Sequence, residues 1–419
     1  MRPFDGRTVL LGVTGGIASY KSAWLARLLT KAGANVDAVL TRSATEFVST
    51  ITFEALTGRP AHTGLFEPGR ALDHITLAKS ADAVVVAPAT ADFLARAATG
   101  QADDLLSAVL LATKASVLLV PAMNDHMWSH PQTQKNVAHL RALGYTVLNP
   151  EEGLLAAGEG EGPGRMPEPE TIYAHIGRLL EPKKTALSGW KVIVTAGPTR
   201  EAIDPVRFVS NHSSGKMGVA LASSAWRRGA EVSLIAGPLG GGVAPPTGPT
   251  LHQVQTTEQM AIAVGELVPS ADVLIMAAAP SDFRPATIAA SKIKKGTGMP
   301  MLKMESTTDI LRSTLALRRK NAIVVGFALE TDDAVANGRK KLEDKSLDLI
   351  VINDATEPGA GFAVDTNRVT LIDRAGAQEV LPLLSKAEVA DAILDRVERI
   401  ANRKVNERAK TPLREFNGR

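Results

Sequence analysis

The strongest local signal for chemistry lies between residues 197 and 218, where polar and charged side chains cluster before a predicted helix. The stretch His212-Ser213-Ser214-Gly215-Lys216 opens a predicted helix over 219–227, where free backbone N–H groups bind anions. Arg200, Arg207 and Asn211 lie nearby in the sequence, and such side chains suit the oxygens of a phosphate or an acyl phosphate. Helix capping explains the serines but not the density of polar groups. The spacing therefore indicates an anion site.

A lysine cluster, Lys292-Ile293-Lys294-Lys295, follows a predicted strand over 273–277 and the acidic residue Asp282. Such clusters are usually solvated surfaces. At the carboxyl end of a strand they can instead hold a triphosphate as point charges. Lys341 and Lys345 lie four residues apart, on one face of a predicted helix.

The turn at Gly15 and Gly16 joins a predicted strand over 8–13 to a helix over about 18–32. Adjacent glycines allow a ligand to approach the backbone, and the helix start offers N–H groups to a phosphate. The G-x-G-x-x-G spacing of dinucleotide-binding proteins is absent, and the turn is not a P-loop. The alternative is a tight strand–helix turn without a ligand.

Two further polar residues follow predicted loops or strands. His74 opens a helical segment over 75–79, where it could equally be a helix cap or a half-buried histidine. Asn124 follows a strand over 116–120, where an amide can bind a carboxylate or a carbonyl. His126 and His130 suggest a metal site, but we discount it because no carboxylate–histidine cluster supports it.

Most of these residues lie in loops that follow short apolar strands, and the strands alternate with helices. This pattern is typical of a parallel sheet covered on both faces. The predicted fold class is α/β, with two doubly wound, mostly parallel, Rossmann-like domains. Ligands in such sheets bind at the carboxyl ends of the strands, which predicts one site per domain. The segments 80–87 and 270–277 are similar in sequence, and we attribute this to a shared fold rather than to duplication.

We predict domains over 1–181 and 190–400, a linker over 182–189 and a basic tail over 401–419. The glycine-rich segment 153–169 is interpreted as a mobile flap within the first domain, with a plain linker as the alternative.

The composition limits the function classes. The 419 residues contain no cysteine, which excludes disulfides, thiolate metal sites and a cysteine nucleophile and fits a cytoplasmic protein. The net charge is +3. Residues 396–419 hold eight Lys/Arg and three Asp/Glu, so this segment carries +5 and the remainder −2. The near-neutral body argues against a nucleic acid partner, and no apolar run is long enough to span a membrane.

Over residues 7–400 the order and spacing of these motifs resemble the bifunctional phosphopantothenoylcysteine decarboxylase / phosphopantothenate–cysteine ligase family of coenzyme A biosynthesis. The resemblance implies a flavodoxin-like, FMN-dependent decarboxylase domain followed by a CTP-dependent ligase domain. In the first domain, His74 would interact with the substrate carboxylate or accept a proton, and Asn124 would orient that carboxylate. The residues that the resemblance implies for FMN are Thr14, Gly15, Gly16, Ser43, Ala89 and Thr90, and Arg165 on the flap would contact substrate.

In the ligase domain the resemblance implies that CTP activates 4'-phosphopantothenate as an acyl-cytidylate, from which cysteine displaces CMP. Asn211 would stabilise the acyl intermediate, Arg207 would bind charged oxygens and Lys292 would neutralise phosphate charge. The triphosphate implies Mg²⁺, whose protein ligands the sequence leaves unknown. The residues implied for substrate phosphate are Ser213, Ser214, Gly215 and Lys216, and those implied for CTP are Ala278, Ala279, Asp282, Lys292, Phe327, Lys341 and Lys345.

One departure from the family concerns the flap. Many members carry a cysteine before the G-x-G-R-M run, and that cysteine is thought to protonate the product. Here Gly162-Pro163-Gly164-Arg165-Met166 follows Leu155-Ala156-Ala157-Gly158, so final protonation needs another donor.

Two alternatives remain open. The first is an active ligase fused to a flavin-binding domain with weak or no decarboxylase activity. The second, a nicotinamide oxidoreductase, is disfavoured by the missing dinucleotide motif. The resemblance also implies a homo-oligomer, namely a dodecamer built from decarboxylase trimers and ligase dimers.

Overall fold

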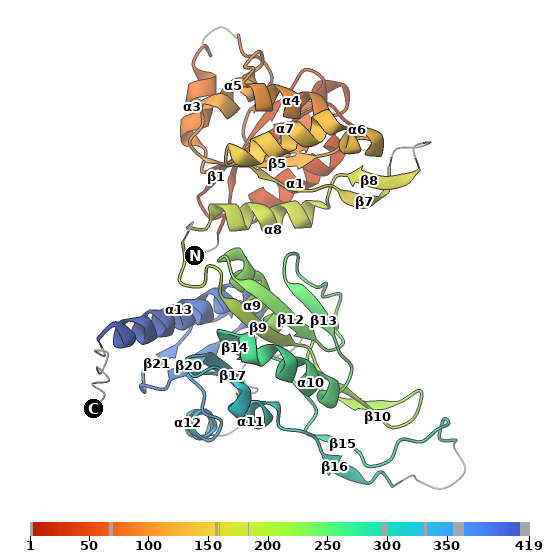
Figure 1. Cartoon of the computed structure of the whole chain (residues 1–419), viewed down its shortest axis with the longest axis vertical. Coiled ribbons are helices and arrows are strands. Elements are labelled where there is room, and N and C mark those ends of the chain that lie inside the picture. Colours follow the sequence, from red (N-terminus) through yellow and green to blue (C-terminus); the bar gives the residue numbers. More distant parts are fainter. Residues whose placement is uncertain are drawn as a thin grey trace, which may run out of the picture. The chain divides into compact units, whose positions relative to one another are not determined.

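The computed structural model describes residues 3–66, 70–155, 158, 160–182, 184–294, 301–330, 333–354 and 364–410. The chain divides into two units, Met1–Pro182 and Lys183–Arg419 (Figure 1). Within the described ranges, no helix combines the length and the apolar character needed to cross a bilayer.

The first unit contains a six-stranded parallel sheet of order β3-β2-β1-β4-β5-β6. This is the Rossmann order, and without the two-residue strand β3 it is the flavodoxin order, so the structure confirms the predicted doubly wound fold. The strands are β1 Thr8–Val13, β2 Asn35–Leu40, β3 Ala61–His62, β4 Ala83–Ala89, β5 Ser116–Pro121 and β6 Thr146–Val147.

Helices cover both faces of this sheet because successive side chains of each buried strand point to opposite sides. Val9 and Leu11 of β1 pack in one core, and Leu10 packs in the other. The first core is formed with α1 Ser19–Lys31, α2 Thr50–Thr57 and α8 Pro169–Leu180. The second is formed with α3 Asp73–Ser80, α4 Ala91–Thr99, α5 Leu105–Ala112 and α7 Pro131–Ala142.

The predicted flap is an antiparallel hairpin of β7 Glu151–Leu154 and β8 Glu161–Arg165. The hairpin follows the short helix α6 Asp125–Ser129 and helix α7 in the chain and precedes α8. It therefore belongs to the first unit and is not an interdomain linker.

The second unit repeats the strand order. Its eight-stranded sheet runs β13-β12-β9-β14-β17-β18-β20-β21, with the first six strands parallel and the last two antiparallel. In chain order the six parallel strands again follow the Rossmann arrangement. The eight strands are β9 Lys191–Ala196, β12 Glu231–Ala236, β13 Thr250–Gln253, β14 Val273–Met276, β17 Ile323–Glu330, β18 Leu349–Asp354, β20 Val369–Asp373 and β21 Gln378–Val380.

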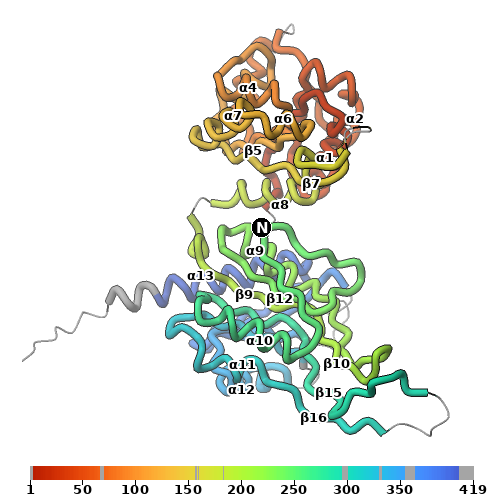
Figure 2. The backbone as a smooth tube through the Cα atoms, turned by 45° about the vertical axis from the view of Figure 1, so that its right-hand side comes forward, coloured from red at the N-terminus to blue at the C-terminus, as the bar shows by residue number. Residues whose placement is uncertain are grey.

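Helices α10 Thr257–Leu267, α11 Ile310–Ser313 and α12 Ala334–Asp344 contribute to the core on one face of this sheet. Helices α9 Lys216–Arg227 and α13 Lys386–Lys410 pack against each other. Figure 2 shows that two small hairpins extend to one side of the sheet. They are β10 Arg200–Ala202 with β11 Phe208–Ser210, and β15 Phe283–Pro285 with β16 Met304–Ser306. A two-stranded pair, β19 Thr366–Asn367 and β22 Leu384–Ser385, precedes α13.

Two predicted boundaries differ from the structure. Residues from 184 to 189, predicted as linker, pack on the second unit, where Leu187 is fully buried and the Gly189 N–H donates to the carbonyl oxygen of Gly229 at 3.0 Å. The hydrophobic effect explains why this segment is not an open linker. The apolar side chain of Leu187 is removed from water when it packs on the second unit. The tail predicted to begin at residue 401 is continuous with α13 up to Lys410.

Candidate active sites

The first candidate site is a cavity of 380 Å³ in the first unit. It lies at the carboxyl ends of β1, β4 and β5, and its size is in the range of small-molecule sites. Of the predicted residues, those that line it are Gly15, Gly16, Thr90, Asn124 and Arg165.

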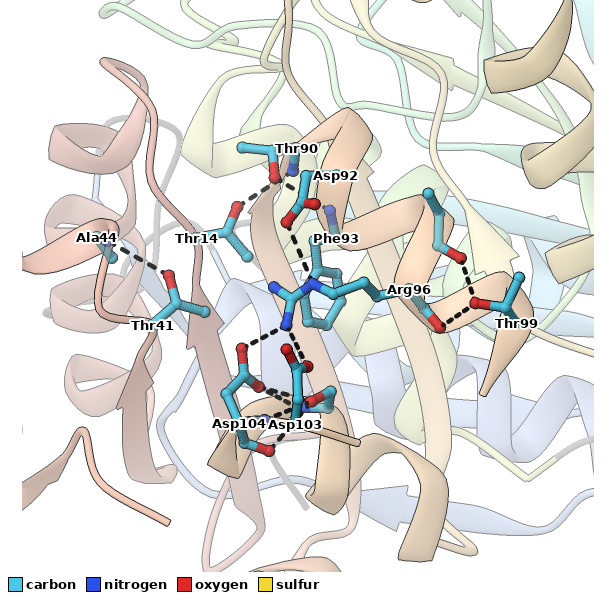
Figure 3. A network of polar contacts seen from close by, with 12 residues as sticks. Thr14, Thr41, Ala44, Thr90, Asp92, Phe93, Arg96, Thr99, Asp103 and Asp104 are labelled. Atoms are coloured by element: carbon cyan, nitrogen blue, oxygen red, sulfur yellow. Dashed lines mark hydrogen bonds and ion pairs between the residues drawn. The ribbon is translucent and has the colours of Figure 1, made fainter. Parts of the chain in front are cut away.

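Thr14 fixes two walls of this cavity to each other. Its buried hydroxyl donates to the carbonyl oxygen of Pro88 at 2.8 Å and accepts from the backbone N–H of Thr90 at 3.1 Å (Figure 3). Thr90 in turn caps α4 by accepting from the Phe93 N–H at 3.3 Å. Thr14 therefore lies behind the cavity surface and sets the position of the loop that forms it.

The glycine turn approaches its neighbours too closely for larger residues. A Cβ atom on Gly15 would lie 2.4 Å from the Cβ atom of Ser43 and 2.8 Å from its carbonyl oxygen. A Cβ on Gly16 would have a single neighbour, Thr90, at 3.9 Å. Gly15 thus packs on the Ser43 loop, while Gly16 leaves open space beside the start of α1. This is the arrangement expected of a turn that admits a phosphate or a ring to the backbone.

Asn124 is the N-cap of α6, and its side-chain oxygen accepts from the His126 N–H at 2.9 Å. Among the described residues its amide nitrogen has no hydrogen-bond partner, so this donor is available on the cavity wall. The neighbouring Met123 N–H donates to the carbonyl oxygen of Gly164 at 3.1 Å. A Cβ on Gly164 would lie 2.2 Å from the Met123 oxygen. The flap therefore joins the Asn124 loop through a contact that requires glycine.

Lys21 is a wall residue that the sequence analysis missed. It is only 6% exposed, and its ammonium group donates to the Met166 carbonyl oxygen at 2.7 Å and to a carboxylate oxygen of Glu168 at 3.1 Å. Glu168 also pairs with Arg165. A buried charge needs such partners. The sequence did offer one sign of this buried lysine, because Lys21 lies on the same face of α1 as the apolar residue Leu25.

The predicted residues Ser43 and Ala89 do not line the cavity of the isolated chain. Ser43 lies behind Gly15, and Ala89 is fully buried in β4. The flap residues Ala156 and Ala157 lie outside the described residues.

His74 is also absent from the cavity lining. It is the second residue of α3, and its Nδ1 atom is buried without a hydrogen-bond partner in the described part of the chain. Asp73 beside it contacts Arg70 Nε at 2.8 Å and His62 Nδ1 at 3.5 Å. Burial and the nearby Arg70 guanidinium lower the pKa of His62. The structure therefore places the half-buried His74 next to Asp73 at the start of α3 and outside the lining of the cavity that contains Asn124.

An ion-pair network holds the helix that follows Thr90. Arg96 of α4 contacts Asp92 at 3.1 Å, Asp103 at 2.9 Å and Asp104 at 2.7 Å (Figure 3). Burial alone would lower the pKa of Arg96, but the hydrogen bonds that Arg96 donates to Asp104 and Asp103 raise it. Burial would raise the pKa of Asp104, but hydrogen bonds from Ser107 and Arg96 lower it.

The second candidate site is a cavity of 530 Å³ in the second unit, at the carboxyl ends of β14, β17 and β18. Most of the residues predicted for the ligase reaction meet there. Those that line the cavity are Asn211, Ser213, Ser214, Gly215, Lys216, Ala278, Ala279, Asp282, Phe327, Lys341 and Lys345.

The start of α9 forms one wall. Gly215 has a φ of +82°, and a Cβ there would lie 2.4 Å from Leu239 Cδ2. A Cβ on Gly218 would lie 2.7 Å from the carbonyl oxygen of Thr195. The glycines bring the helix N-terminus directly onto the end of β9. The free N–H groups at this helix start therefore lie at the cavity, in the position that anion sites use.

Lysines supply positive charge around this cavity. Lys216 pairs with Asp365 at 2.6 Å, and Lys345 pairs with Asp309 at 3.2 Å. The ammonium group of Lys341 donates to the Phe327 carbonyl oxygen at 2.8 Å. The hydrogen bond from Lys216 lowers the pKa of Asp365. The charge suits a polyanionic ligand.

The cavity also contains residues that the sequence analysis did not select. Lys386 is 7% exposed and donates to the Val364 carbonyl oxygen at 2.5 Å, and burial together with Lys216 lowers its pKa. The side-chain oxygen of Asn353 is buried without a hydrogen-bond partner in the described part of the chain. Asn353 is the next-to-last residue of β18, so a polar residue at the end of an apolar run was the sign available in the sequence. Asn367 lines the cavity as well, but nothing in its local sequence marks it.

Asn211 is held against the opposite loop. Its side-chain amide nitrogen donates to the carbonyl oxygens of Ala279 at 3.0 Å and Pro280 at 3.1 Å. These two bonds orient the Asn211 amide toward the loop that follows β14.

Arg207 and Lys292 do not line the cavity of the isolated chain. The Arg207 guanidinium donates to Asp204 at 2.8 Å and to the Ile293 carbonyl oxygen at 3.2 Å. Asp204 accepts the backbone N–H of Ile293 at 3.2 Å. Burial would raise the pKa of Asp204, but hydrogen bonds from backbone N–H groups lower it. Arg207 and Asp204 thus clamp the segment next to Lys292 through the backbone of Ile293.

Among the described residues, no group of three or more His, Asp or Glu side chains could hold a metal ion.

Comparison with known proteins places both units in one family. The model "Flavoprotein" matches residues 2–181, and the model "DNA/pantothenate metabolism flavoprotein C-terminal domain" matches residues 187–400. A relative from Mycobacterium tuberculosis, "Coenzyme A biosynthesis bifunctional protein CoaBC", is 46% identical over 404 residues, which cover 93% of this chain and 96% of the relative. The Bacillus subtilis protein of the same name is 44% identical over 397 residues, covering 94% and 97%.

A crystal structure of the C-terminal domain of a CoaBC protein is 38% identical and covers 52% of this chain and 99% of that domain, with a TM-score of 0.45. The two family models together extend from residue 2 to residue 400, and the relatives align over nearly their whole lengths. The chain therefore belongs to the family of bifunctional CoaBC proteins of coenzyme A biosynthesis.

Proposed function

We propose that this chain performs two successive reactions. The second unit joins 4'-phosphopantothenate to cysteine with CTP, and the first unit decarboxylates the resulting phosphopantothenoylcysteine to 4'-phosphopantetheine. The observation that carries the proposal is the presence of two separate cavities, each at the carboxyl ends of a parallel sheet and each lined by a predicted motif. Membership in a bifunctional family supports both halves.

In the first unit, the residues that would hold FMN are Thr14, Gly15, Gly16, Ser43, Ala89 and Thr90. The open space beside Gly16 fits a flavin phosphate or ring. The amide nitrogen of Asn124, which has no hydrogen-bond partner in the described part of the chain, fits a substrate carboxylate. When bound, FMN supplies the reversible oxidation of the substrate's cysteine side chain that makes loss of carbon dioxide possible.

The chain's own residues bind and orient the decarboxylation substrate. Asn124 donates to the substrate carboxylate and keeps it beside the flavin site. Arg165, held by Glu168, binds a substrate oxygen from the flap. His74 interacts with the carboxylate or accepts a proton. Because His74 does not line the cavity of a single chain, this role requires that it reach the cavity of another copy.

In the second unit, an oxygen of the 4'-phosphopantothenate carboxylate attacks the α-phosphorus of CTP, and pyrophosphate leaves. The amine of cysteine then attacks the acyl carbon, and CMP leaves. Asn211 stabilises the acyl intermediate, and the start of α9 binds the substrate phosphate. Lys292 and Arg207 supply charge next to the phosphates. The residues that would contact CTP are Ala278, Ala279, Asp282, Lys292, Phe327, Lys341 and Lys345.

Mg²⁺ would enter this site with the nucleotide. Magnesium in nucleotide sites is bound largely through phosphate oxygens and water, with one or two protein carboxylates. Two carboxylates among the described residues line this cavity, Asp282 and Asp309, and Asp309 already pairs with Lys345.

A second candidate function, an active ligase with a weak or inactive flavin-binding unit, is favoured by one observation. The chain contains no cysteine, so the flap lacks the proton donor expected from the family. Retention of Asn124 on the cavity wall favours an active decarboxylase, in which water or another side chain protonates the product.

We further propose that the protein is cytoplasmic and assembles as a homo-oligomer, a dodecamer of decarboxylase trimers and ligase dimers. Exposed apolar side chains beside the first cavity support contact with further copies, since such patches mark interfaces. Among them are Ile17, Tyr20 and Leu154, which are 66%, 63% and 77% exposed. A neighbouring copy would also provide the route by which His74 reaches a cavity.

Separate assays of the two half-reactions test the proposal. We expect pyrophosphate release that requires CTP and 4'-phosphopantothenate, and carbon dioxide release that requires phosphopantothenoylcysteine. Activity with ATP in place of CTP would contradict the nucleotide assignment. Carbon dioxide release no faster than with free FMN would favour the second candidate.

A further inference from the structure

Glu201 is a buried carboxylate for which the reaction described above has no use. It lies on β10, is 4% exposed and does not line the cavity. One of its oxygens accepts the backbone N–H of Thr257 at 2.8 Å and the hydroxyl of the same residue at 2.9 Å. A carboxylate in such a place must be held for a reason, because its burial is costly.

The contacts of Thr257 define the direction in which a chain of buried hydrogen bonds runs from donor to acceptor. Its hydroxyl has one proton. Two acceptors lie within reach, a carboxylate oxygen of Glu201 at 2.9 Å and the Ser281 carbonyl oxygen at 3.3 Å, and the proton goes to the closer, charged acceptor. The hydroxyl of Thr199, 2.9 Å away, must therefore donate to Thr257. Thr199 in turn accepts the backbone N–H of Ser281 at 2.9 Å. The result is a one-way chain of hydrogen bonds from Ser281 through Thr199 and Thr257 to Glu201.

This chain is shielded from water along its whole length. Thr199 and Thr257 are 0% and 1% exposed, and Ser281 is 6% exposed. Hydrogen bonds in such surroundings strengthen one another and are costly to break. The chain therefore fixes the Ser281 peptide more firmly than a solvated loop contact would.

The Ser281 peptide belongs to the loop that holds Asn211. The preceding residues, Ala279 and Pro280, provide the two carbonyl oxygens to which the Asn211 amide donates. The loop is also tied to β9 by the Ala279 N–H, which donates to the Gly197 carbonyl oxygen at 2.9 Å. A shift of the Ser281 peptide would move both acceptors of Asn211.

We propose that Glu201 is a positioning residue of the ligase reaction: through Thr257, Thr199 and Ser281 it sets the orientation of the Asn211 amide. This inference rests on the proposed ligase function and on the role assigned to Asn211. Glu201 touches no reactant and acts only through the loop.

The test is a double-mutant cycle between the chain and Asn211, measured on the full-length protein as CTP-dependent pyrophosphate release. Thr199→Val keeps the shape of the side chain but removes both hydrogen bonds. We expect kcat to fall about tenfold, the effect of one buried unsatisfied donor. Thr199→Ser, which keeps the hydroxyl, should retain most of the kcat of the parent protein. In an Asn211→Ala background, Thr199→Val should lower kcat by less than about twofold, because coupled residues are not additive.

Three controls separate the outcomes. Ser270→Ala removes a hydroxyl elsewhere in the unit, bonded to the Leu267 carbonyl oxygen at 3.0 Å, and should leave kcat unchanged. Carbon dioxide release by the first unit of the same variants measures the amount of intact chain. If Thr199→Val lowers the melting temperature of the second unit, the same double-mutant cycle with Asn211 is measured with Thr257→Val and Thr257→Ser, since Thr257 is the next residue in the hydrogen-bond chain.

Two results would overturn the inference in different ways. Additive losses in the double mutant would show that the chain acts independently of Asn211, and the ligase function would stand. Unchanged kcat in Asn211→Ala alone would overturn the role assigned to Asn211, and this inference with it.

Discussion

The backbone N–H of Thr90 donates a 3.1 Å hydrogen bond to the hydroxyl oxygen of Thr14, 76 residues earlier in the chain (Figure 3). The same hydroxyl donates to the carbonyl oxygen of Pro88. The turn after β1 and the turn after β4 are therefore one structural unit, and the cavity of the first unit lies beside it. Flavin binding should depend on this contact although Thr14 itself does not line the cavity.

Replacement of Thr14 by valine should weaken flavin binding. The substitution keeps the side-chain shape but leaves the Thr90 N–H without its acceptor, at a cost of about 1–3 kcal/mol. We expect the dissociation constant of FMN, measured by quenching of its fluorescence, to rise at least about fivefold. Thr14→Ser keeps the hydroxyl and should bind nearly as the parent does. Equal affinity in Thr14→Val and the parent would contradict the role given to this contact.

The two glycines of the first turn should respond differently to alanine. In Gly15→Ala the new methyl group meets the Ser43 backbone at 2.8 Å, whereas in Gly16→Ala its neighbour is 3.9 Å away. Overpacking of this kind costs about 1–3 kcal/mol. We expect a lower melting temperature of the first unit in Gly15→Ala but not in Gly16→Ala. The Gly16 variant should instead lose FMN affinity, because its methyl group projects beside the cavity. A reversed order of melting temperatures would contradict the packing described here.

Removal of the Lys21 charge should impair decarboxylation selectively. Lys21→Met keeps the length of the side chain but removes the donor to Met166 and Glu168. Residues 165–168 then lose an anchor, and Arg165 on the flap is held less firmly. We expect the rate of carbon dioxide release to fall about tenfold. CTP-dependent pyrophosphate release by the same protein is the internal control and should be unchanged. Equal losses in both reactions would point to a general folding defect instead.

The first unit should become less stable in acid partly through Asp104. Its folded-state pKa lies below the unfolded value, since the hydrogen bonds from Ser107 and Arg96 outweigh burial. A lowered carboxyl pKa contributes stability above the unfolded pKa of about 4, and this contribution is lost as the pH falls through the folded-state pKa. Asp104→Asn should cost about 1–2 kcal/mol at pH 7. It should also flatten the decline of unfolding free energy below pH 4, measured by urea denaturation. A parallel decline in both proteins would contradict this assignment.

The start of α9 should be essential for ligase substrate binding. In Gly215→Ala the residue keeps a φ near +82° at a steric cost of about 1–2 kcal/mol, and its methyl group meets Leu239 at 2.4 Å. We expect the KM for 4'-phosphopantothenate to rise at least about fivefold. Gly240→Ala is the matched control in the facing loop, because a Cβ there has its nearest neighbour at 3.8 Å. An unchanged KM in the Gly215 variant would contradict the anion site.

Local sequence patterns were sufficient to predict the strands and the loops at their carboxyl ends. Apolar runs ending in polar residues led to Thr14, Thr90 and Asn124 in the first unit. In the second unit, a cluster of polar residues before a helix led to Asn211, and the resemblance to the family led to Phe327, which lies within β17. Such loops lie close together because every parallel strand of a doubly wound sheet ends at the same edge, so residues distant in sequence meet there.

Contacts across long sequence distances could not be predicted. The pairing of Lys21 with Glu168 joins residues 147 apart, and that of Glu201 with Thr257 joins residues 56 apart. Neither has a local pattern, because which buried polar groups meet is decided by tertiary packing. For the same reason, the sequence did not indicate that His74 lies outside the cavity lining of a single chain. A local sequence also cannot show that Leu187 lies on the second unit and not in an open linker.

The most direct test of the whole account is one reaction mixture containing the purified chain, 4'-phosphopantothenate, cysteine, CTP, Mg²⁺ and FMN. Mass spectrometry would follow the products with time. The account predicts that phosphopantothenoylcysteine appears first and that 4'-phosphopantetheine then accumulates with an equal amount of carbon dioxide, and that both require CTP. Accumulation of phosphopantothenoylcysteine alone, with no carbon dioxide above that produced by free FMN, would contradict it.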